Sequence, residues 1–70
     1  MGDGFPRRLR MLRERKGISR RVLADFCRVS KSALARYERG EQEPTSGVII
    51  QMADYFEVSA DFLLGRTENF

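Results

Sequence analysis

The chain has no histidine and a single cysteine, and these absences exclude several kinds of site. Cys27 cannot form an internal disulfide, and without histidine the usual zinc sites cannot be assembled. The sequence also has no apolar run of about 20 residues, the length that spans a bilayer, and no apolar signal-peptide core at its start. We therefore expect a cytoplasmic protein with no metal, no other cofactor and no membrane partner.

Catalytic signatures are missing as well. There is no glycine-rich phosphate loop, no nucleophile beside a base, and no acidic pair spaced for a shared site. A chain of 70 residues forms one domain at most, and at this size only roughly 60% of the unfolded surface is buried on folding. Little room is left for a cleft, so we expect neither enzymatic activity nor a small-molecule ligand.

Charge is unevenly distributed along the chain. Residues 1–40 contain twelve Lys and Arg against four Asp and Glu, whereas residues 41–70 contain one against six. A strongly basic half is typical of a surface that faces a polyanion such as nucleic acid, although solvated helix faces can also be rich in charge. The uneven distribution of charge therefore predicts that the binding surface lies in the first half of the chain.

Helical periodicity recurs in five segments, and no segment alternates as a strand would. Phe5, Leu9 and Leu12 are spaced for one helix face, and Gly17 provides a stop. Hydroxyl residues suited to N-caps precede the four later segments: Ser19, Ser30, Thr45 and Ser59. We expect an all-α domain over residues 5–65, with residues 1–4 and 66–70 as short flexible ends.

The apolar residues divide into a core set and a surplus. The expected core comprises Leu9, Leu12, Leu23, Ala24, Cys27, Leu34, Ile49, Met52, Ala53, Phe56 and Leu63. A core this small cannot also hold Met11, Phe26, Val48, Tyr55, Phe62 and Phe70. Exposed apolar patches often mark protein interfaces, so we expect a homodimer that associates through the fourth and fifth helices and the C-terminal tail.

Several linked motifs resemble the Cro/repressor (XRE-type) helix-turn-helix family. They are Leu23-Ala24, Val29-Ser30, the run from Arg36 to Gly40, and Asp61-Phe62-Leu63-Leu64. The resemblance covers nearly the whole chain and implies a compact, five-helix, lambda-repressor-like domain in which the second and third helices form the helix-turn-helix. It also implies sequence-specific binding of double-stranded DNA by a transcriptional regulator, a repressor acting as a homodimer.

Carried over by position, the resemblance assigns residue roles. The third helix would lie in the major groove. Its base-reading positions are Lys31, Ser32, Ala33 and Arg36, whose hydrogen-bonding groups and methyl group suit base edges. Phosphate contacts fall to Ser19, Arg20, Arg21, Ser30 and Arg39. The pair Arg13 and Glu38 would instead be a structural ion pair between the first and third helices.

Some positions depart from the family pattern. Arg28 and Glu57 stand where glycine is usual in turns, and a non-glycine residue in the left-handed region costs roughly 1 to 2 kcal/mol. Either these turns are strained or their geometry differs and re-aims the third helix. Glu41 and Glu43 follow the third helix, and their negative charge argues against a phosphate contact there.

Two other functions remain open from the sequence. The apolar residues near the C-terminus also suit an antitoxin-like or other protein-interaction module in which DNA binding is secondary. The basic segment from Arg7 to Lys16 could serve as an amphipathic helix for membranes or calmodulin-like partners. The glycine stops and caps that follow this segment favour a complete domain over that last alternative.

Overall fold

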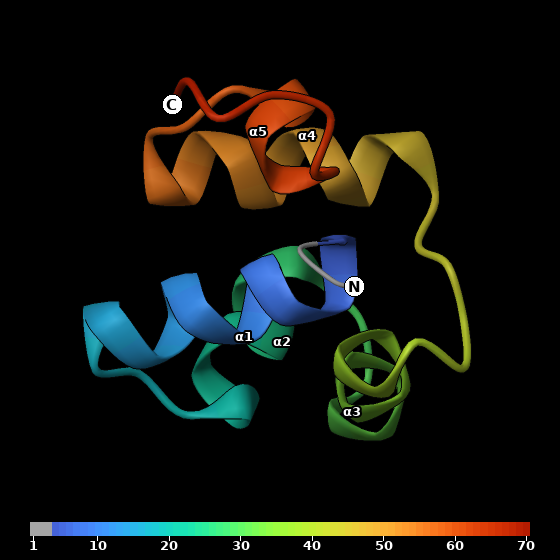
Figure 1. The fold of residues 1–70 in the computed structure, drawn as a ribbon. Helices are drawn as coiled ribbons and strands as arrows, with labels where there is room; N and C mark the ends of the chain where they lie inside the picture. The colour runs from blue at the N-terminus through green and yellow to red at the C-terminus, as the bar shows by residue number, and fades with distance from the viewer. Residues whose placement is uncertain (1–3) are drawn as a thin grey trace.

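A computed structural model describes residues 4–70, and all regular structure in this range is helical. The elements are α1 (Phe5–Lys16), α2 (Arg20–Cys27), α3 (Lys31–Arg39), α4 (Ser46–Phe56) and α5 (Ala60–Leu63). Figure 1 shows α1, α2 and α3 together in its lower part, with α4 and α5 above them. The expected all-α architecture with five helices is confirmed. None of the helices in the described range is both long and apolar enough to cross a membrane.

Each of the four expected N-caps forms. The hydroxyl oxygens accept backbone N–H groups from the first turns of α2, α3, α4 and α5: Ser19 from Val22, Ser30 from Ala33, Thr45 from Val48, and Ser59 from Phe62. Such a bond satisfies one of the donors that a helix start otherwise leaves free, and each cap contributes about 1 kcal/mol. The caps therefore fix where four of the helices begin.

The turns that end α2 and α4 are left-handed despite lacking glycine. Arg28 has φ 59° and Glu57 has φ 58°. Each donates its backbone N–H to carbonyls of the preceding helix turn. The chain thus accepts the strain instead of adopting a different turn, which resolves the choice left open by the sequence. At the end of α3, Gly40 takes the same conformation, with φ 75°.

The core lies between the two groups of helices. Most of the expected core residues are buried, and Ile49 and Phe56 are partly buried against the others. Tyr37 and Phe62 are also buried, so Phe62 belongs to the core and not to the apolar surplus. Burial raises the pKa of the Cys27 thiol, which favours its neutral form in this apolar setting.

Exposed apolar side chains remain on α2, on α4 and on the C-terminal tail. Val22 and Phe26 are about half exposed on α2, and Phe26 stacks against Tyr55 of α4 at 4.6 Å between ring centroids. Ile50 of α4 and Phe70 of the tail are exposed by 55% and 70%. Of the six residues predicted to lie outside the core, only Phe26 and Phe70 are exposed. Met11, Val48 and Tyr55 are partly buried against the core, whereas Val22 and Ile50 are exposed and are not in the predicted set.

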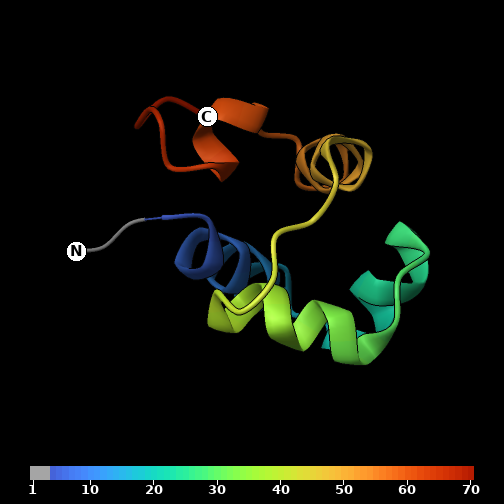
Figure 2. The same cartoon turned by 90° about the vertical axis from the view of Figure 1, so that its right-hand side faces the viewer.

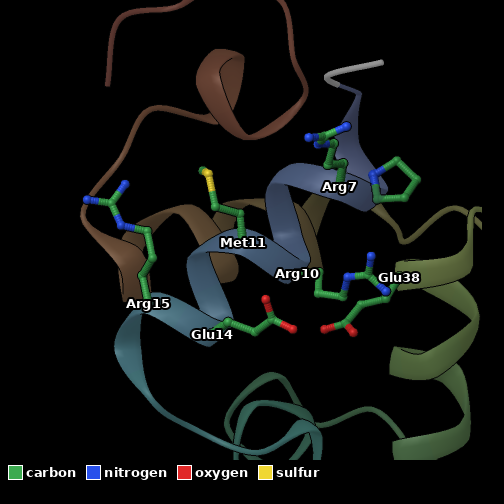
Figure 3. Close-up of a pocket in the computed structure, with 7 residues that line it drawn as sticks. Arg7, Arg10, Met11, Glu14, Arg15 and Glu38 are labelled. Carbon is green, nitrogen blue, oxygen red and sulfur yellow. The ribbon is translucent and has the colours of Figure 1, made fainter. Parts of the chain in front are cut away.

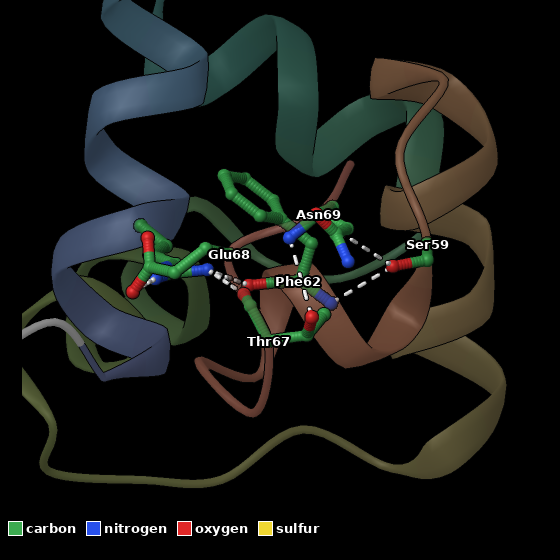
Figure 4. Close-up of polar contacts among 6 residues, drawn as sticks. Ser59, Phe62, Thr67, Glu68 and Asn69 are labelled. Atoms are coloured by element: carbon green, nitrogen blue, oxygen red, sulfur yellow. Dashed lines mark hydrogen bonds and ion pairs between the residues drawn. The ribbon is translucent and has the colours of Figure 1, made fainter.

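The C-terminal segment 66–70 packs against the helices. Arg8 of α1 is 3% exposed, and its Nη1 donates to the carbonyl oxygens of Phe62 at 2.8 Å and Thr67 at 2.6 Å. Its Nη2 lies 3.1 Å from Glu68 Oε2, and the contacts of Ser59 with Phe62 and Asn69 adjoin this cluster (Figure 4). Arg8 thus connects α1 with segment 66–70, which the sequence predicts to be a flexible end. Apart from Gly4, the other expected flexible end, 1–4, lies outside the described residues.

Candidate nucleic-acid interface

Helix α3 lies at the outer edge of the domain with one side packed inward. In Figure 2 it runs along the lower edge of the molecule, in front of α1 and beside α2. Its buried residues are Ala33, Leu34, Tyr37 and Glu38. With 3.6 residues per turn, residues 31, 32, 35, 36 and 39 occupy the opposite arc of this helix. The helix therefore has one buried side and one outer side that is not covered by the other helices.

The outer arc of α3 carries most of the predicted base-reading residues. Lys31 and Ser32 are exposed at its N-terminal end, and Arg36 is partly exposed one turn further along. Ala33 differs from them, because it is only 8% exposed and belongs to the core cluster. The structure thus brings Lys31, Ser32 and Arg36 to one side of the helix, and it places most of Ala33 against the interior.

The predicted phosphate-binding residues lie at the start of α2 and at the two ends of α3. Ser19 and Ser30 sit at the N-termini of α2 and α3, where each hydroxyl oxygen accepts a cap bond and its proton remains available to donate. Arg21 and Arg39 are exposed. Helix N-termini attract anions through their free N–H groups and the helix dipole, and exposed Arg21 adds positive charge at the start of α2.

A buried carboxylate joins the three helices that build this surface. The side chain of Glu38 is 2% exposed, and its Oε2 accepts from Arg13 Nε at 2.6 Å. Its Oε1 accepts from Arg20 Nε at 3.0 Å. The family resemblance assigns Arg13 to a structural pair and Arg20 to a phosphate contact. In the structure Arg20 also pairs with Glu38, while its side chain stays 42% exposed. The Glu38 carboxylate of α3 therefore connects this helix with both α1 and α2.

Two arginines of α3 have partners in the loop that follows it. Arg39 Nε and Nη2 donate to the two carboxylate oxygens of Glu41, at 2.9 and 3.1 Å. This hydrogen bond, helped by the opposite charge, lowers the pKa of the Glu41 carboxyl below its ordinary value and raises the pKa of Arg39. Arg36 Nε donates to Gln42 Oε1 at 2.7 Å. Both arginines are thus oriented before any partner binds.

A surface groove of about 760 Å³ runs along α1 (Figure 3). Its lining is Pro6, Arg7, Arg10, Met11, Glu14, Arg15 and Glu38. In Figure 3 Arg10 and Glu38 lie close together beside α3, while Arg7 and Arg15 lie toward opposite ends of α1. Three arginines and two glutamates line this groove, so its surface is less uniformly positive than the outer arc of α3.

Residue patterns alone did not identify Arg8 or Gln42. Arg8 lies three residues after Phe5 and four before Leu12, so helical spacing could have placed it on the buried face of α1. Gln42 follows α3 by only three residues, but no sequence rule pairs it with Arg36. Within residues 4–70, no group of three or more potential ligands among His, Cys, Asp and Glu is placed to hold a metal.

The caps, the short turn at Arg28 and the exposed outer arc of α3 define a helix-turn-helix domain. A family model described as a helix-turn-helix domain matches residues 5–63, which is most of the chain. The chain therefore belongs to the helix-turn-helix family, of the Cro/repressor (XRE) type, as its motifs indicated.

Curated relatives are regulators of transcription by name. The chain is 39% identical over 59 residues to the HTH-type transcriptional regulator AnsR of Bacillus subtilis, covering 84% of this chain and 51% of that protein. It is 35% identical over 63 residues to the prophage-derived, uncharacterized HTH-type regulator YonR of the same organism, covering 90% and 58%. The chain thus spans little more than half the length of these relatives. These names agree with the expectation of a non-enzymatic protein.

A solved structure shares the arrangement of the helices. The P22 c2 repressor, crystallised with a synthetic operator, superposes with a TM-score of 0.87 at 26% identity, covering 94% of this chain and all of that one. This likeness confirms the lambda-repressor-like fold predicted from the motifs.

Proposed function

We propose that this domain binds double-stranded DNA with α3 in the major groove and thereby regulates transcription as a repressor. The observation that carries the proposal is the division of α3 into a buried side and a polar outer arc with Lys31, Ser32 and Arg36. Sequence-specific binding needs side chains that reach base edges from a rigid helix, and this arc supplies them. Such a role would place the protein in the cytoplasm, with the DNA it reads.

In this proposal the remaining exposed groups fix the register of the helix on the duplex. Ser19, Arg21, Ser30 and Arg39 contact phosphates, which carry no sequence information but set orientation. Arg20 contributes through its exposed part while its Nε remains on Glu38. Ala33 contributes little, because its methyl group faces the core.

The proposed active form is a homodimer. Half-sites one helical turn apart require two copies of the domain in a fixed relation. Exposed Ile50 on α4 and Phe70 on the tail support association through α4, α5 and the C-terminal segment. Those elements also lie above the layer that contains α3 (Figure 1), which keeps the reading helix free.

A second candidate function is a protein-interaction module, of the antitoxin type, in which DNA binding is secondary. The exposed Val22 and Phe26 on α2 favour it, because they extend the apolar surface beyond the elements assigned to the dimer. Sedimentation of the purified protein separates the two candidates. A dimer at micromolar concentration supports the regulator, and a monomer that forms a stoichiometric complex with one purified protein partner supports the module.

Duplex titration at two salt concentrations tests the proposed function directly. Fluorescently labelled duplexes from a random pool are selected with the protein, and the bound sequences are then titrated at 50 and 200 mM salt. With about six phosphate contacts, affinity should fall by roughly 1,000-fold between these conditions, and the selected site should be a near-palindrome. No binding to any duplex at the lower salt concentration overturns the proposal.

A further inference from the structure

Arg36, the only arginine among the predicted base-reading residues, is held by a side chain from outside the helix-turn-helix. Its Nε donates to Gln42 Oε1 at 2.7 Å. Gln42 lies in the loop that connects α3 with α4, and it is exposed. The hydrogen bonds and ion pairs within residues 4–70 leave both terminal nitrogens of Arg36 without a partner.

This pattern leaves the recognition end of the arginine available. A guanidinium has five N–H donors, of which one is on Nε and four are on the two terminal nitrogens. The terminal pair can bind O6 and N7 of guanine together, the commonest specific contact in the major groove. Gln42 therefore occupies the single Nε donor and leaves the four donors on the terminal nitrogens available.

The backbone around Gln42 is fixed by the same helix turn that carries Arg36. The N–H of Glu41 donates to the carbonyl oxygen of Arg36 at 2.9 Å, and that of Gly40 donates to Tyr37 at 3.1 Å. The left-handed conformation of Gly40 makes this closure possible. The positions of Arg36 and Gln42 are thus coupled locally, and they do not depend on how distant helices pack.

We propose that Gln42 is a positioning residue that sets base specificity by orienting the Arg36 guanidinium before DNA is bound. The inference rests on the proposed function, since it assigns Gln42 to the same DNA-reading surface. A long side chain that is free must lose rotamer freedom on binding. A side chain already held at Nε loses less, and it is held in one direction, which favours the one base edge that fits that direction.

The opposite effect would follow if Gln42 only masked Arg36. In that case removing the amide would release the arginine and strengthen binding to the selected site. A positioning role requires the reverse, with weaker discrimination at a single base pair. The two roles therefore differ in the sign of the change.

Gln42→Met tests the proposal, because methionine has similar length and no strong acceptor. The duplex selected by the wild-type protein serves as the probe, together with its single-base-pair variants. Arg36→Ala first identifies the base pair that Arg36 reads. Gln42→Met should then lower discrimination at that pair by about 3-fold to 10-fold, the range of one net hydrogen bond, with other positions changed by less than about 2-fold. In the double variant, Gln42→Met should add nothing to Arg36→Ala.

Two controls keep the outcome specific. Gln51→Met makes the same chemical change at an exposed position of α4 and should leave discrimination unchanged. Gln42→Glu keeps an acceptor oxygen at the same reach, so it should retain the discrimination while its negative charge lowers affinity for every duplex. Equal weakening at all base pairs by Gln42→Met, or stronger binding, overturns the proposal.

A measurement without DNA separates this proposal from the proposed function. In the free wild-type protein, the Nε–H of Arg36 should exchange with solvent several-fold more slowly than in Gln42→Met, as seen by NMR. Identical exchange in both proteins overturns the role of Gln42 even if the domain binds DNA. If exchange is slower in the wild-type protein than in Gln42→Met but the protein binds no duplex, the contact between Arg36 and Gln42 exists. The DNA-reading function is then overturned, and with it the role of Gln42 in base specificity.

Discussion

Arg13 Nε lies 2.6 Å from Glu38 Oε2, and this contact joins α1 to the inner side of α3. A second bond runs from Arg13 Nη2 to Glu38 Oε1 at 3.3 Å, and Arg13 Nη1 donates to the carbonyl oxygen of Ile18. Because this contact attaches the inner side of α3 to α1, it also helps to fix the direction in which the outer arc of α3 faces. The pair thus connects domain stability with the geometry of the proposed DNA-binding surface.

Glu38→Gln should destabilise the domain by on the order of 3 kcal/mol. The change removes the charge that two arginines share, and it leaves the guanidinium of Arg13, which is 11% exposed, without its counterion. Urea unfolding followed by circular dichroism gives the free energy. Glu14→Gln, at an exposed position of α1, is the matched control and should change stability by less than about 0.5 kcal/mol. Equal effects of the two changes would show that the network adds no stability.

Arg36→Ala and Arg21→Gln should weaken DNA binding in different ways. Arg36→Ala should cost roughly 1 to 3 kcal/mol on the selected site and relax the preference at one base pair. Arg21 is exposed and has no partner within residues 4–70. Arg21→Gln should therefore weaken all duplexes alike and reduce the salt slope by about 0.9. Titrations of the selected site and of its single-base variants distinguish these outcomes, and a base-selective loss in Arg21→Gln would contradict its role.

Arg8→Met should loosen the C-terminal segment. Methionine retains the apolar stem beneath the Phe62 ring, which lies 4.3 Å from the Arg8 guanidinium carbon. The carbonyl oxygens of Phe62 and Thr67, however, lose a donor. We expect the free energy of unfolding to fall by on the order of 2 kcal/mol, and chemical unfolding measures this change. Glu68→Gln is the control, because that side chain is 85% exposed and its ion pair should contribute less than about 1 kcal/mol. A loss in Glu68→Gln as large as in Arg8→Met would contradict this account.

The N-caps could be predicted from the sequence and the Arg13–Glu38 pair from the family resemblance, whereas the partners of Arg8 and Arg36 could not. Ser19 and Ser30 act as caps because the cap interaction involves residues three apart in the chain. Arg8 reaches Thr67, 59 residues further on, and only the packing of α5 against α1 determines that contact. In the same way, the exposure of Ala33 depends on how α3 is rotated about its axis, which the motif does not specify.

The ion pair between Arg39 and Glu41 should lower the pKa of the Glu41 carboxyl below its ordinary value. The hydrogen bond from Arg39 is the main cause of the lowered pKa, and the positive charges of Arg39 and Arg36 add to it. Because the folded-state pKa is lowered, the stabilisation from this pair is complete above the unfolded-state pKa. It is lost as the pH falls through the folded-state value.

NMR titration of the Glu41 carboxyl group measures this effect. The midpoint should lie below that of an ordinary glutamate in the wild-type protein, and Arg39→Gln should raise it toward the ordinary value. The remaining influence of Arg36 should keep the midpoint slightly low. A midpoint that does not respond to Arg39→Gln would show that the contact does not persist in solution.

Arg28→Gly should stabilise the domain by about 0.5 to 1 kcal/mol. Arg28 has φ 59°, and relief of left-handed strain in a residue with a Cβ is worth roughly 1 to 2 kcal/mol. The greater freedom of glycine in the unfolded chain offsets about half of that gain. Thermal unfolding should show a rise in Tm of several degrees for a domain of this size.

The reverse substitution at Gly17 provides the matched control. Gly17 has φ 74°, and a Cβ built there meets no other atom within 4 Å. Gly17→Ala therefore adds left-handed strain without a steric clash and should lower stability by about 1 kcal/mol. If Arg28→Gly lowered stability as well, then the arginine side chain would have to contribute more than its backbone strain costs. The turn between α2 and α3 would then depend on that side chain and not on its backbone conformation alone.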